Sequence, residues 1–184
     1  KVIKAGSVTV NANGVENLSV LGGDGDDSIT LVGASSFEAV VLSGQAGNDT
    51  VTLDKPATDD AVTVDGGTGS QDRFTVGLTD NAEVVSVTAS GVTVGGKTTA
   101  NVSNVEVLGL DSAGGDDVVT VVSTHAGSFD LDTGSGSDTV TVHTTSGALD
   151  LDTGSDKDTI NVRSINAAAT VDGGDGEDTV NVGN

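Results

Sequence analysis

The sequence contains no cysteine, methionine, tryptophan or tyrosine, and it has only one proline. Without cysteine, neither a disulfide nor a thiolate metal site can form. A thick globular core normally draws much of its buried area from aromatic side chains, which here are limited to Phe37, Phe74 and Phe129. The sequence therefore favours a narrow interior filled by valine, leucine, isoleucine and alanine.

Basic residues are also scarce, because 7 lysines and arginines stand against 28 aspartates and glutamates, for a formal charge of −21. Nucleic acids and anionic membrane surfaces attract clustered positive charge, so neither is expected as a partner. No apolar run approaches the roughly 20 residues of a membrane-spanning helix, so we expect no membrane insertion. Disorder is disfavoured because 35% of the residues are hydrophobic and regularly patterned. Cations are the partners that this composition favours.

One motif recurs seven times along the chain. An apolar residue leads into a turn of glycine, serine and aspartate, the turn closes on an aspartate, and an alternating apolar–polar stretch follows, as at 131–142. The closing aspartates are Asp27, Asp49, Asp72, Asp117, Asp138, Asp158 and Asp178, with spacings of 22, 23, 45, 21, 20 and 20 residues. The spacing of 45 is close to two periods, so one coil is expected to lack the motif.

A period of 20 to 23 residues with two strand-like segments is typical of one coil of a solenoid. Residues 139–142 alternate, with Val140 and Val142 on one face, and residues 149–152 alternate in the same way after a short turn. We therefore predict an all-β fold, a right-handed parallel β-solenoid of the β-helix or β-roll kind. Its coils have 20 to 23 residues, equivalent strands stack in parallel, and the glycine/aspartate turns stack on one edge.

A longer repeat overlies the coils. Residues 5–11 and 17–23 resemble stretches that lie 84 and 87 residues further along the chain. We therefore divide the chain into a first solenoid unit at 1–88 and a second unit at 89–184, in one continuous stack. Residues 84–97 read as a β-hairpin that covers the coil without the motif.

Two of the turns, at 22–27 and 173–178, have the sequences GGDGDD and GGDGED and are each followed by an alternating strand. They resemble the GGxGxDxUx pattern of hemolysin-type, RTX-like calcium-binding repeats, in which U is a large aliphatic residue. The resemblance implies Ca²⁺ bound between neighbouring coils by turn carbonyls and by the closing aspartates. The other five turns are degenerate forms of the pattern.

The implied calcium ligands are the seven closing aspartates and three further acids inside the full motifs, Asp24, Asp26 and Asp175. Successive glycines let carbonyl groups turn toward one point, and Ca²⁺ takes about six to eight oxygen ligands. Carboxylates stacked about 4.8 Å apart repel one another, and a divalent ion would reverse the sign of that energy. The alternative is a set of aspartate-capped turns without metal.

The pattern departs from the family in its period, because the family repeats recur about every nine residues and these recur every 20 to 23. The opposite turns, such as 123–127 and 143–148, contain no aspartate, so we expect calcium on one edge only. Outward acids on the return strands are interpreted as a solvated face, with weak peripheral cation sites as the alternative. These acids are Asp130, Asp132, Asp150, Asp152 and Asp172.

We predict a structural, calcium-rigidified repeat module of an extracellular bacterial surface, matrix or filament-forming protein, similar to an adhesin. Neither end reads as a cap, so head-to-tail self-association or pairing with further repeats of the same chain is expected. An enzyme is not expected, because His125 and His143 lie off the repeat period and Arg73 and Arg163 are isolated. The alternative function is a carbohydrate- or ice-binding module with a flat face of threonine and aspartate.

Overall fold

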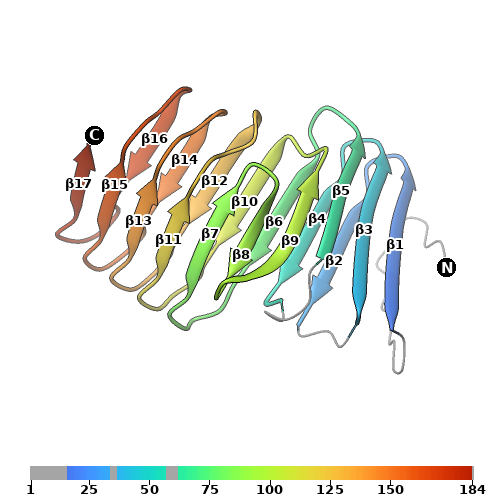
Figure 1. The fold of residues 1–184 in the computed structure, drawn as a ribbon, viewed down its shortest axis with the longest axis horizontal. Coiled ribbons are helices and arrows are strands. Elements are labelled where there is room, and N and C mark those ends of the chain that lie inside the picture. The colour runs from blue at the N-terminus through green and yellow to red at the C-terminus, as the bar shows by residue number, and fades with distance from the viewer. Residues whose placement is uncertain (1–15, 34–36, 57–61, 184) are drawn as a thin grey trace.

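The computed structural model describes residues 16–33, 37–56 and 62–183. Within these residues every named element is a β-strand, and the strands form two sheets that run the length of the molecule (Figure 1). The predicted all-β solenoid of parallel stacked strands is confirmed, with about 7 turns. No helix that could cross a membrane is found in the part of the chain that the structure describes.

The larger sheet, called sheet A, has ten strands. In spatial order they are β1 (Asn17–Asp24), β3 (Ala39–Ala46), β5 (Val62–Thr68), β9 (Lys97–Ser103), β8 (Gly91–Val94), β7 (Val84–Thr88), β11 (Val118–Val121), β13 (Thr139–Val142), β15 (Thr159–Val162) and β17 (Thr179–Val182). Sheet B has seven strands. In spatial order they are β2 (Ser28–Val32), β4 (Thr50–Asp54), β6 (Arg73–Gly77), β10 (Val107–Asp111), β12 (Ser128–Asp132), β14 (Leu149–Asp152) and β16 (Ala169–Asp172).

The chain passes from one sheet to the other and back in each coil, and equivalent strands of successive coils pair in parallel. In β13 and β15, Val140 stands opposite Ile160 and Val142 opposite Val162. Because successive side chains of a strand point to opposite faces, this register stacks apolar side chains inside and polar ones outside. All four residues are at most 2% exposed, as the alternating sequence predicts.

The interior is a narrow column of aliphatic side chains with two buried aromatic rings. Phe74 of β6 and Phe129 of β12 are fully buried, and both stand beside Leu108 of β10 in sheet B. The buried apolar residues form one cluster that extends from Ile29 to Val162. Stability therefore comes from many small contacts between neighbouring coils rather than from one large centre.

Within the described residues the alternation between sheets is interrupted once, where three consecutive strands lie in sheet A. Strands β7, β8 and β9 form an antiparallel meander, β9 pairs in parallel with β5, and β7 pairs in parallel with β11. The predicted hairpin of β7 and β8 is confirmed. A second hairpin joins β8 to β9 through Gly95 and Gly96, whose φ angles of 59° and 78° suit a tight turn of glycines.

The glycine/aspartate turns change edge at the meander. In the first three coils they lead from sheet A to sheet B, just before β2, β4 and β6, and we call this side the first edge. In the last four coils they lead from sheet B to sheet A, just after β10, β12, β14 and β16, and we call this side the second edge. The sheet B strands are all parallel, so the two sets of turns lie at opposite edges.

The expectation of a single edge is therefore wrong, and the reason lies in the 45-residue interval between Asp72 and Asp117. That interval has the length of two coils, but it consists of about one and a half coils plus the two additional strands of the meander. The division into units at 1–88 and 89–184 stays a prediction, since residues 5–11, which support it, lie outside the described residues.

Candidate functional site

The closing aspartates lie inside the stack of turns rather than on its surface. Aspartate is seldom buried unless it is paired or bound to a metal. The two in the outermost described coils, Asp27 and Asp178, are partly buried. The five in the inner coils are at most 1% exposed, namely Asp49, Asp72, Asp117, Asp138 and Asp158.

At the first edge these carboxylates form a ladder of hydrogen bonds along the stack. The backbone N–H of Asp27 donates to Oδ1 of Asp49 at 2.8 Å, and the N–H of Asp49 donates to Oδ1 of Asp72 at 2.8 Å. The N–H of Asp72 donates in the same way to Oε2 of Glu106 at 2.8 Å. Glu106 follows β9 and so ends this ladder in the coil without the motif.

At the second edge a longer ladder begins with a glutamate. The N–H of Glu83 donates to Oδ1 of Asp117 at 2.7 Å, and the N–H of Asp117 donates to Oδ1 of Asp138 at 2.8 Å. Two further bonds, of 2.8 Å and 3.0 Å, join Asp138 to Asp158 and Asp158 to Asp178. Each of the four aspartates in this ladder thus points its carboxylate toward the preceding coil and accepts one of its backbone N–H groups.

The second oxygen of most ladder carboxylates has no partner. A buried acceptor without a donor costs about 1–3 kcal/mol, and more when the group is charged. Rows of such oxygens therefore favour a cation, a proton or a buried water as a partner. The buried oxygens without a hydrogen bond are Oδ2 of Asp27, Asp49, Asp72, Asp117, Asp138 and Asp158 and Oε2 of Glu83.

The turn glycines bring carboxylate and carbonyl oxygens into the same small space. A Cβ atom at Gly22 would lie 2.6 Å from the carbonyl oxygen of Gly44 and 2.7 Å from Oδ2 of Asp27. At Gly44 it would collide with Oδ2 of Asp49 and with the carbonyl oxygen of Gly66. Mixed sets of carboxylate and carbonyl oxygens are the ligands that Ca²⁺ prefers.

The degenerate turns keep the backbone shape of the full motifs. Gln45, which pairs with Gly23 and Gly67 of the adjacent coils, has a φ of 81°. Ala113 has a φ of 66°, close to the 85° of Gly134 in the next coil. Positive φ is strained for residues with a side chain, so the stacked neighbours hold these turns in place.

Burial raises the pKa of several ladder aspartates. In Asp138, burial raises the pKa to about 6. The nearby Thr133 hydroxyl, which donates to the Thr153 carbonyl, and the Asp117 backbone N–H oppose the shift, and the charges of Asp117 and Asp158 add to it. Burial likewise raises the pKa of Asp49 and of Asp117. Without a cation these groups hold protons more readily than ordinary aspartates do.

The three further acids predicted inside the full motifs lie outside the ladders. Asp24, Asp26 and Asp175 are exposed. Oδ1 of Asp26 accepts a hydrogen bond from the N–H of Asn48 at 2.8 Å, and Asp175 forms a backbone bridge with Ser155. Their role as calcium ligands stays a prediction.

Two glutamates of the ladders cannot be recognised from the motif, because neither follows a glycine-rich turn. Glu83 binds Asp117 and Glu106 binds Asp72, and each pair is separated by 34 residues across the meander. The equal separation of 34 residues is a signal in the sequence, but it identifies the two glutamates only when the position of the meander is already known.

The turns without aspartate use buried threonines instead. At the first edge beyond Glu106, Oγ1 of Thr124 accepts the N–H of Ser146 at 2.8 Å, and Oγ1 of Thr145 accepts the N–H of Asn166 at 3.2 Å. Thr124 and Thr145 are at most 1% exposed. A neutral hydroxyl caps the neighbouring coil without burying charge, so this part of the edge needs no cation.

A separate row of acids lies on the outer face of sheet B. Asp111, Asp132, Asp152 and Asp172 stand opposite one another in adjacent strands. The carboxylates of Asp111, Asp152 and Asp172 each accept the N–H two residues further on, at 2.9 Å, 2.9 Å and 3.0 Å, so they close strand ends as Asx turns. Burial and the charges of Asp111 and Asp152 raise the pKa of Asp132.

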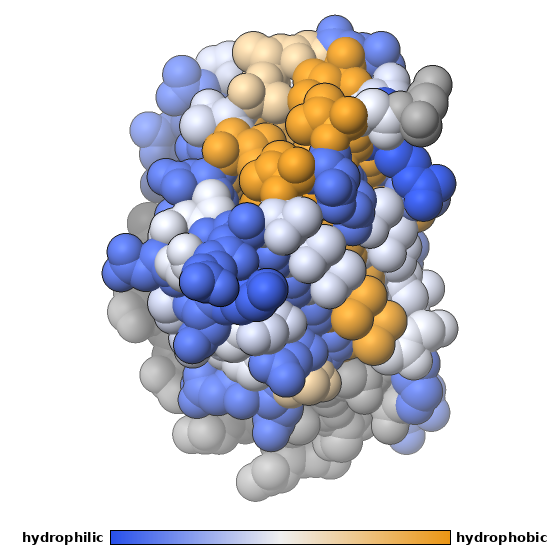
Figure 2. All heavy atoms as spheres, turned by 90° about the vertical axis from the view of Figure 1, so that its left-hand side faces the viewer, coloured by the Kyte–Doolittle hydropathy of each residue, from blue (hydrophilic) through white to orange (hydrophobic). Residues whose placement is uncertain are grey.

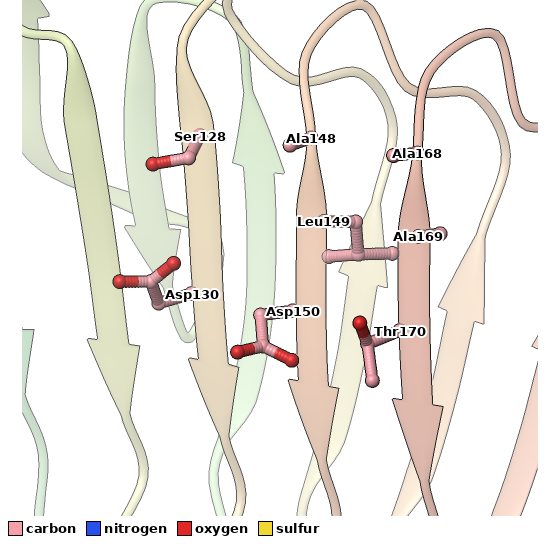
Figure 3. A pocket seen from close by; sticks show the side chains of 8 residues that line it. All are labelled: Ser128, Asp130, Ala148, Leu149, Asp150, Ala168, Ala169 and Thr170. Carbon is pink, nitrogen blue, oxygen red and sulfur yellow. The ribbon is translucent and has the colours of Figure 1, made fainter.

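The same face carries a shallow hollow between β12, β14 and β16. Figure 3 shows Asp130 and Asp150 on neighbouring strands with Thr170 beyond them, and Ser128, Leu149 and three alanines complete the lining. Asp130 forms an ion pair with Arg73 at 2.9 Å. Among the described residues no three His, Cys, Asp or Glu side chains are grouped to hold a metal, so carbonyl oxygens would supply most ligands of any bound cation.

Comparisons with protein-family models, with curated proteins and with solved structures give no match. The class that the fold defines is the parallel β-solenoid. The resemblance to RTX-like repeats rests on the turn sequences of this chain alone.

Proposed function

We propose that this chain is a structural repeat module, a rod segment that calcium ions rigidify, in an extracellular bacterial surface, matrix or filament-forming protein. The observation that carries the proposal is the pair of carboxylate ladders, whose inward oxygens lack donors. Ions bound between neighbouring coils would join those coils along the stack. The charge of −21 favours such binding over the whole molecule.

The closing aspartates would supply one carboxylate oxygen to each ion, and the turn carbonyls of adjacent coils would supply others. Calcium modules that work outside cells bind at about 10⁻⁴–10⁻³ M, which suits sites with few carboxylates per ion. An extracellular location follows from this chemistry as part of the proposal, because free calcium at that level is found outside cells. The module would act through stiffness rather than catalysis.

The outer face of sheet A is less suited to binding a flat ligand. One row on this face is regular, since Thr120, Thr141 and Asn161 stand opposite one another in adjacent strands. The row that contains Thr139 is interrupted by Val118 and Val84, which are 42% and 61% exposed. No observation on this face favours ice or carbohydrate over water.

The substitution Asp138→Asn tests the proposal by the sign of its effect. Asparagine keeps an oxygen for the Asp117 N–H but removes a buried negative charge. With EDTA at pH 7.5 we expect a higher melting temperature than wild type, because the uncompensated charge is gone. With millimolar calcium we expect a lower one, by about 1–3 kcal/mol of stability.

Circular dichroism melting curves and calorimetric calcium titrations measure these effects. The matched control is Asp150→Asn, an exposed acid on sheet B, which should change neither. A loss of stability in Asp138→Asn that is equal with EDTA and with calcium would indicate a purely structural hydrogen bond and count against calcium at the ladder.

Self-association is expected at the end of the stack. Figure 2 views the C-terminal end and shows apolar side chains gathered over part of it. Val180 and Val182 of β17 are 48% and 75% exposed, whereas their equivalents Ile160 and Val162 are 0% and 2% exposed. A second copy, or further repeats, would cover the same face that each inner coil covers.

Multi-angle light scattering should therefore detect oligomers with calcium and monomers with EDTA, since cations reduce the repulsion between two acidic copies. Val180→Asp should reduce association, and Val84→Asp, at a position on the side of the rod that is 61% exposed, should not. A strict monomer at high concentration with calcium present would refute head-to-tail association.

A further inference from the structure

The loop at 78–83 joins β6 to β7 and contains no glycine, yet it takes the place of a glycine/aspartate turn at the second edge. A Cβ atom at Gly115 would lie 2.7 Å from the carbonyl oxygen of Asn81, and one at Gly136 would meet the carbonyl oxygen of Gly115 in the same way. Glu83 bonds to Asp117 as Asp117 bonds to Asp138. The loop is therefore one more member of this stack.

Two carboxyl groups meet where the loop stacks on the turn at 112–117. The side chains of Glu83 and Asp117 lie within hydrogen-bonding reach of each other. Oε2 of Glu83 and Oδ2 of Asp117 are both buried, and neither accepts a hydrogen bond. Asp117 as a whole is 1% exposed. Two buried carboxylate oxygens this close repel each other unless a positive charge lies between them.

The neighbouring residues orient this pair. The Thr79 hydroxyl donates to Oε1 of Glu83, and Asn81 bonds to the Thr79 oxygen through its backbone N–H at 3.3 Å and its side-chain amide at 2.9 Å. Thr79 thus holds one oxygen of Glu83 and leaves the other free to face Asp117. The arrangement is fixed by the loop rather than by a flexible surface side chain.

We propose that a divalent cation of the Ca²⁺ class binds between Glu83 and Asp117, in a site that the loop at 78–83 completes. The inference rests on the proposed calcium binding of the ladders, but it adds a site that the repeat motif does not contain. Burial, assisted by the charge of Asp117, raises the pKa of Glu83, so a shared proton is the competing occupant.

The site would have a particular structural consequence. The loop at 78–83 precedes the meander and the turn at 112–117 follows it. A cation between them would bind together two segments that are 34 residues apart in sequence, at the one place where the regular coils are interrupted. It would keep the rod stiff across the meander.

Glu106 provides a matched comparison at the other edge. It is also hydrogen-bonded to a closing aspartate 34 residues away, but in the opposite direction. Oε2 of Glu106 accepts the N–H of Asp72 at 2.8 Å, whereas Glu83 donates its own N–H to Asp117. Glu83 and Glu106 are both partly buried, but the oxygens of Glu106 are not among the buried ones that lack a partner. Glu106 therefore matches Glu83 in its place next to a closing aspartate, but it has no unpartnered buried oxygen.

The test is to count bound calcium in Glu83→Gln and in Glu106→Gln by equilibrium dialysis of the whole 184-residue chain against calcium chloride. Glu83→Gln should bind one ion fewer than wild type, and Glu106→Gln should bind the same number. If wild type and Glu83→Gln bind equal numbers of ions, the pair holds a proton and the inference is overturned while the ladders stand. If wild type binds no calcium, the proposed function itself fails.

Thr79→Val keeps both carboxylates and serves if Glu83→Gln does not fold, which far-ultraviolet circular dichroism would reveal. Without the hydroxyl, Glu83 loses its orienting bond, so one site should weaken by roughly 5- to 10-fold, the effect of about one hydrogen bond. Unchanged affinity at every site of Thr79→Val would overturn the inference in that case.

Discussion

Removal of calcium at neutral pH is expected to lower the melting temperature of this protein by about 20 °C or more. Five pairs of neighbouring closing aspartates are joined in the two ladders. An ion that binds only the folded stack stabilises it by about 2.7 kcal/mol at 100 times its dissociation constant, a ratio that about 10 mM calcium gives for a site of about 10⁻⁴ M. Each kcal/mol moves the midpoint of a domain of this size by about 2–4 °C, so several occupied sites give a large total.

The measurement is thermal unfolding followed by circular dichroism, with EDTA in one sample and about 10 mM calcium in the other. A third sample with sodium chloride at matched ionic strength controls for screening of the surface charge, which monovalent ions also reduce. Coincident melting curves with EDTA and with calcium would remove the ladders from consideration as metal sites. A shift produced equally by sodium chloride would assign the effect to general screening.

The fold could be predicted because two periods in the sequence agree. Alternation within strands, as at Val140 and Val142, decides which face is buried, and the spacing of about 20 residues places equivalent strands side by side. A shift of the register by one residue would expose the whole apolar set. Local pattern and global repeat therefore point to one arrangement, which is typical of repeat proteins.

The edge of each turn could not be predicted, because it depends on how many times the chain crosses between the sheets. The sequence between Asp72 and Asp117 has the length of two coils, and the meander within it changes the crossing number without changing the length. Gly95 and Gly96 are the local sign of the second hairpin, but two glycines in a chain with 27 carry little information.

The ladder geometry lay beyond the sequence for a different reason. The motif identifies the closing aspartates, but it does not indicate that Oδ1 caps the preceding coil and Oδ2 faces inward, since that depends on the stacking of separate coils. Glu83 illustrates the limit most clearly. Its neighbours in sequence resemble an ordinary polar loop, and only the contact with Asp117 gives it a role.

The pH dependence of the calcium-free protein separates buried charge from surface charge. The pKa of Asp138 is about 6 in the folded stack, against 3.8 as its ordinary value, and the pKa of Asp49, Asp117 and Glu83 is raised as well. A group whose pKa is higher in the folded state binds protons more tightly there, so folding is opposed once those protons are lost. The cost sets in as the pH rises from about 4 and is complete above about 6.

Without calcium, the protein is therefore expected to be more stable at pH 5 than at pH 7.5, the reverse of an ordinary acidic domain with paired carboxylates. Asp138 alone contributes on the order of 1 kcal/mol to this difference, out of about 3 kcal/mol for its whole pKa shift. With saturating calcium the order should invert, because protons and calcium compete for the same oxygens. Both melting series are measured in 0.5 M sodium chloride, which screens the exposed acids far more than the buried ladders.

Asp138→Asn is the decisive control, since it should reduce the gain in calcium-free stability between pH 7.5 and pH 5 and leave the unfolded state little changed. Asp150→Asn, which removes the same charge from an exposed position, should leave that gain as it is in wild type. A calcium-free protein that loses stability on acidification to pH 5 would mean that the ladder oxygens are satisfied without proton or metal. Protons and calcium ions would neutralise the same buried carboxylates. If neither changes the stability of the protein, the ladder carboxylates carry no uncompensated charge.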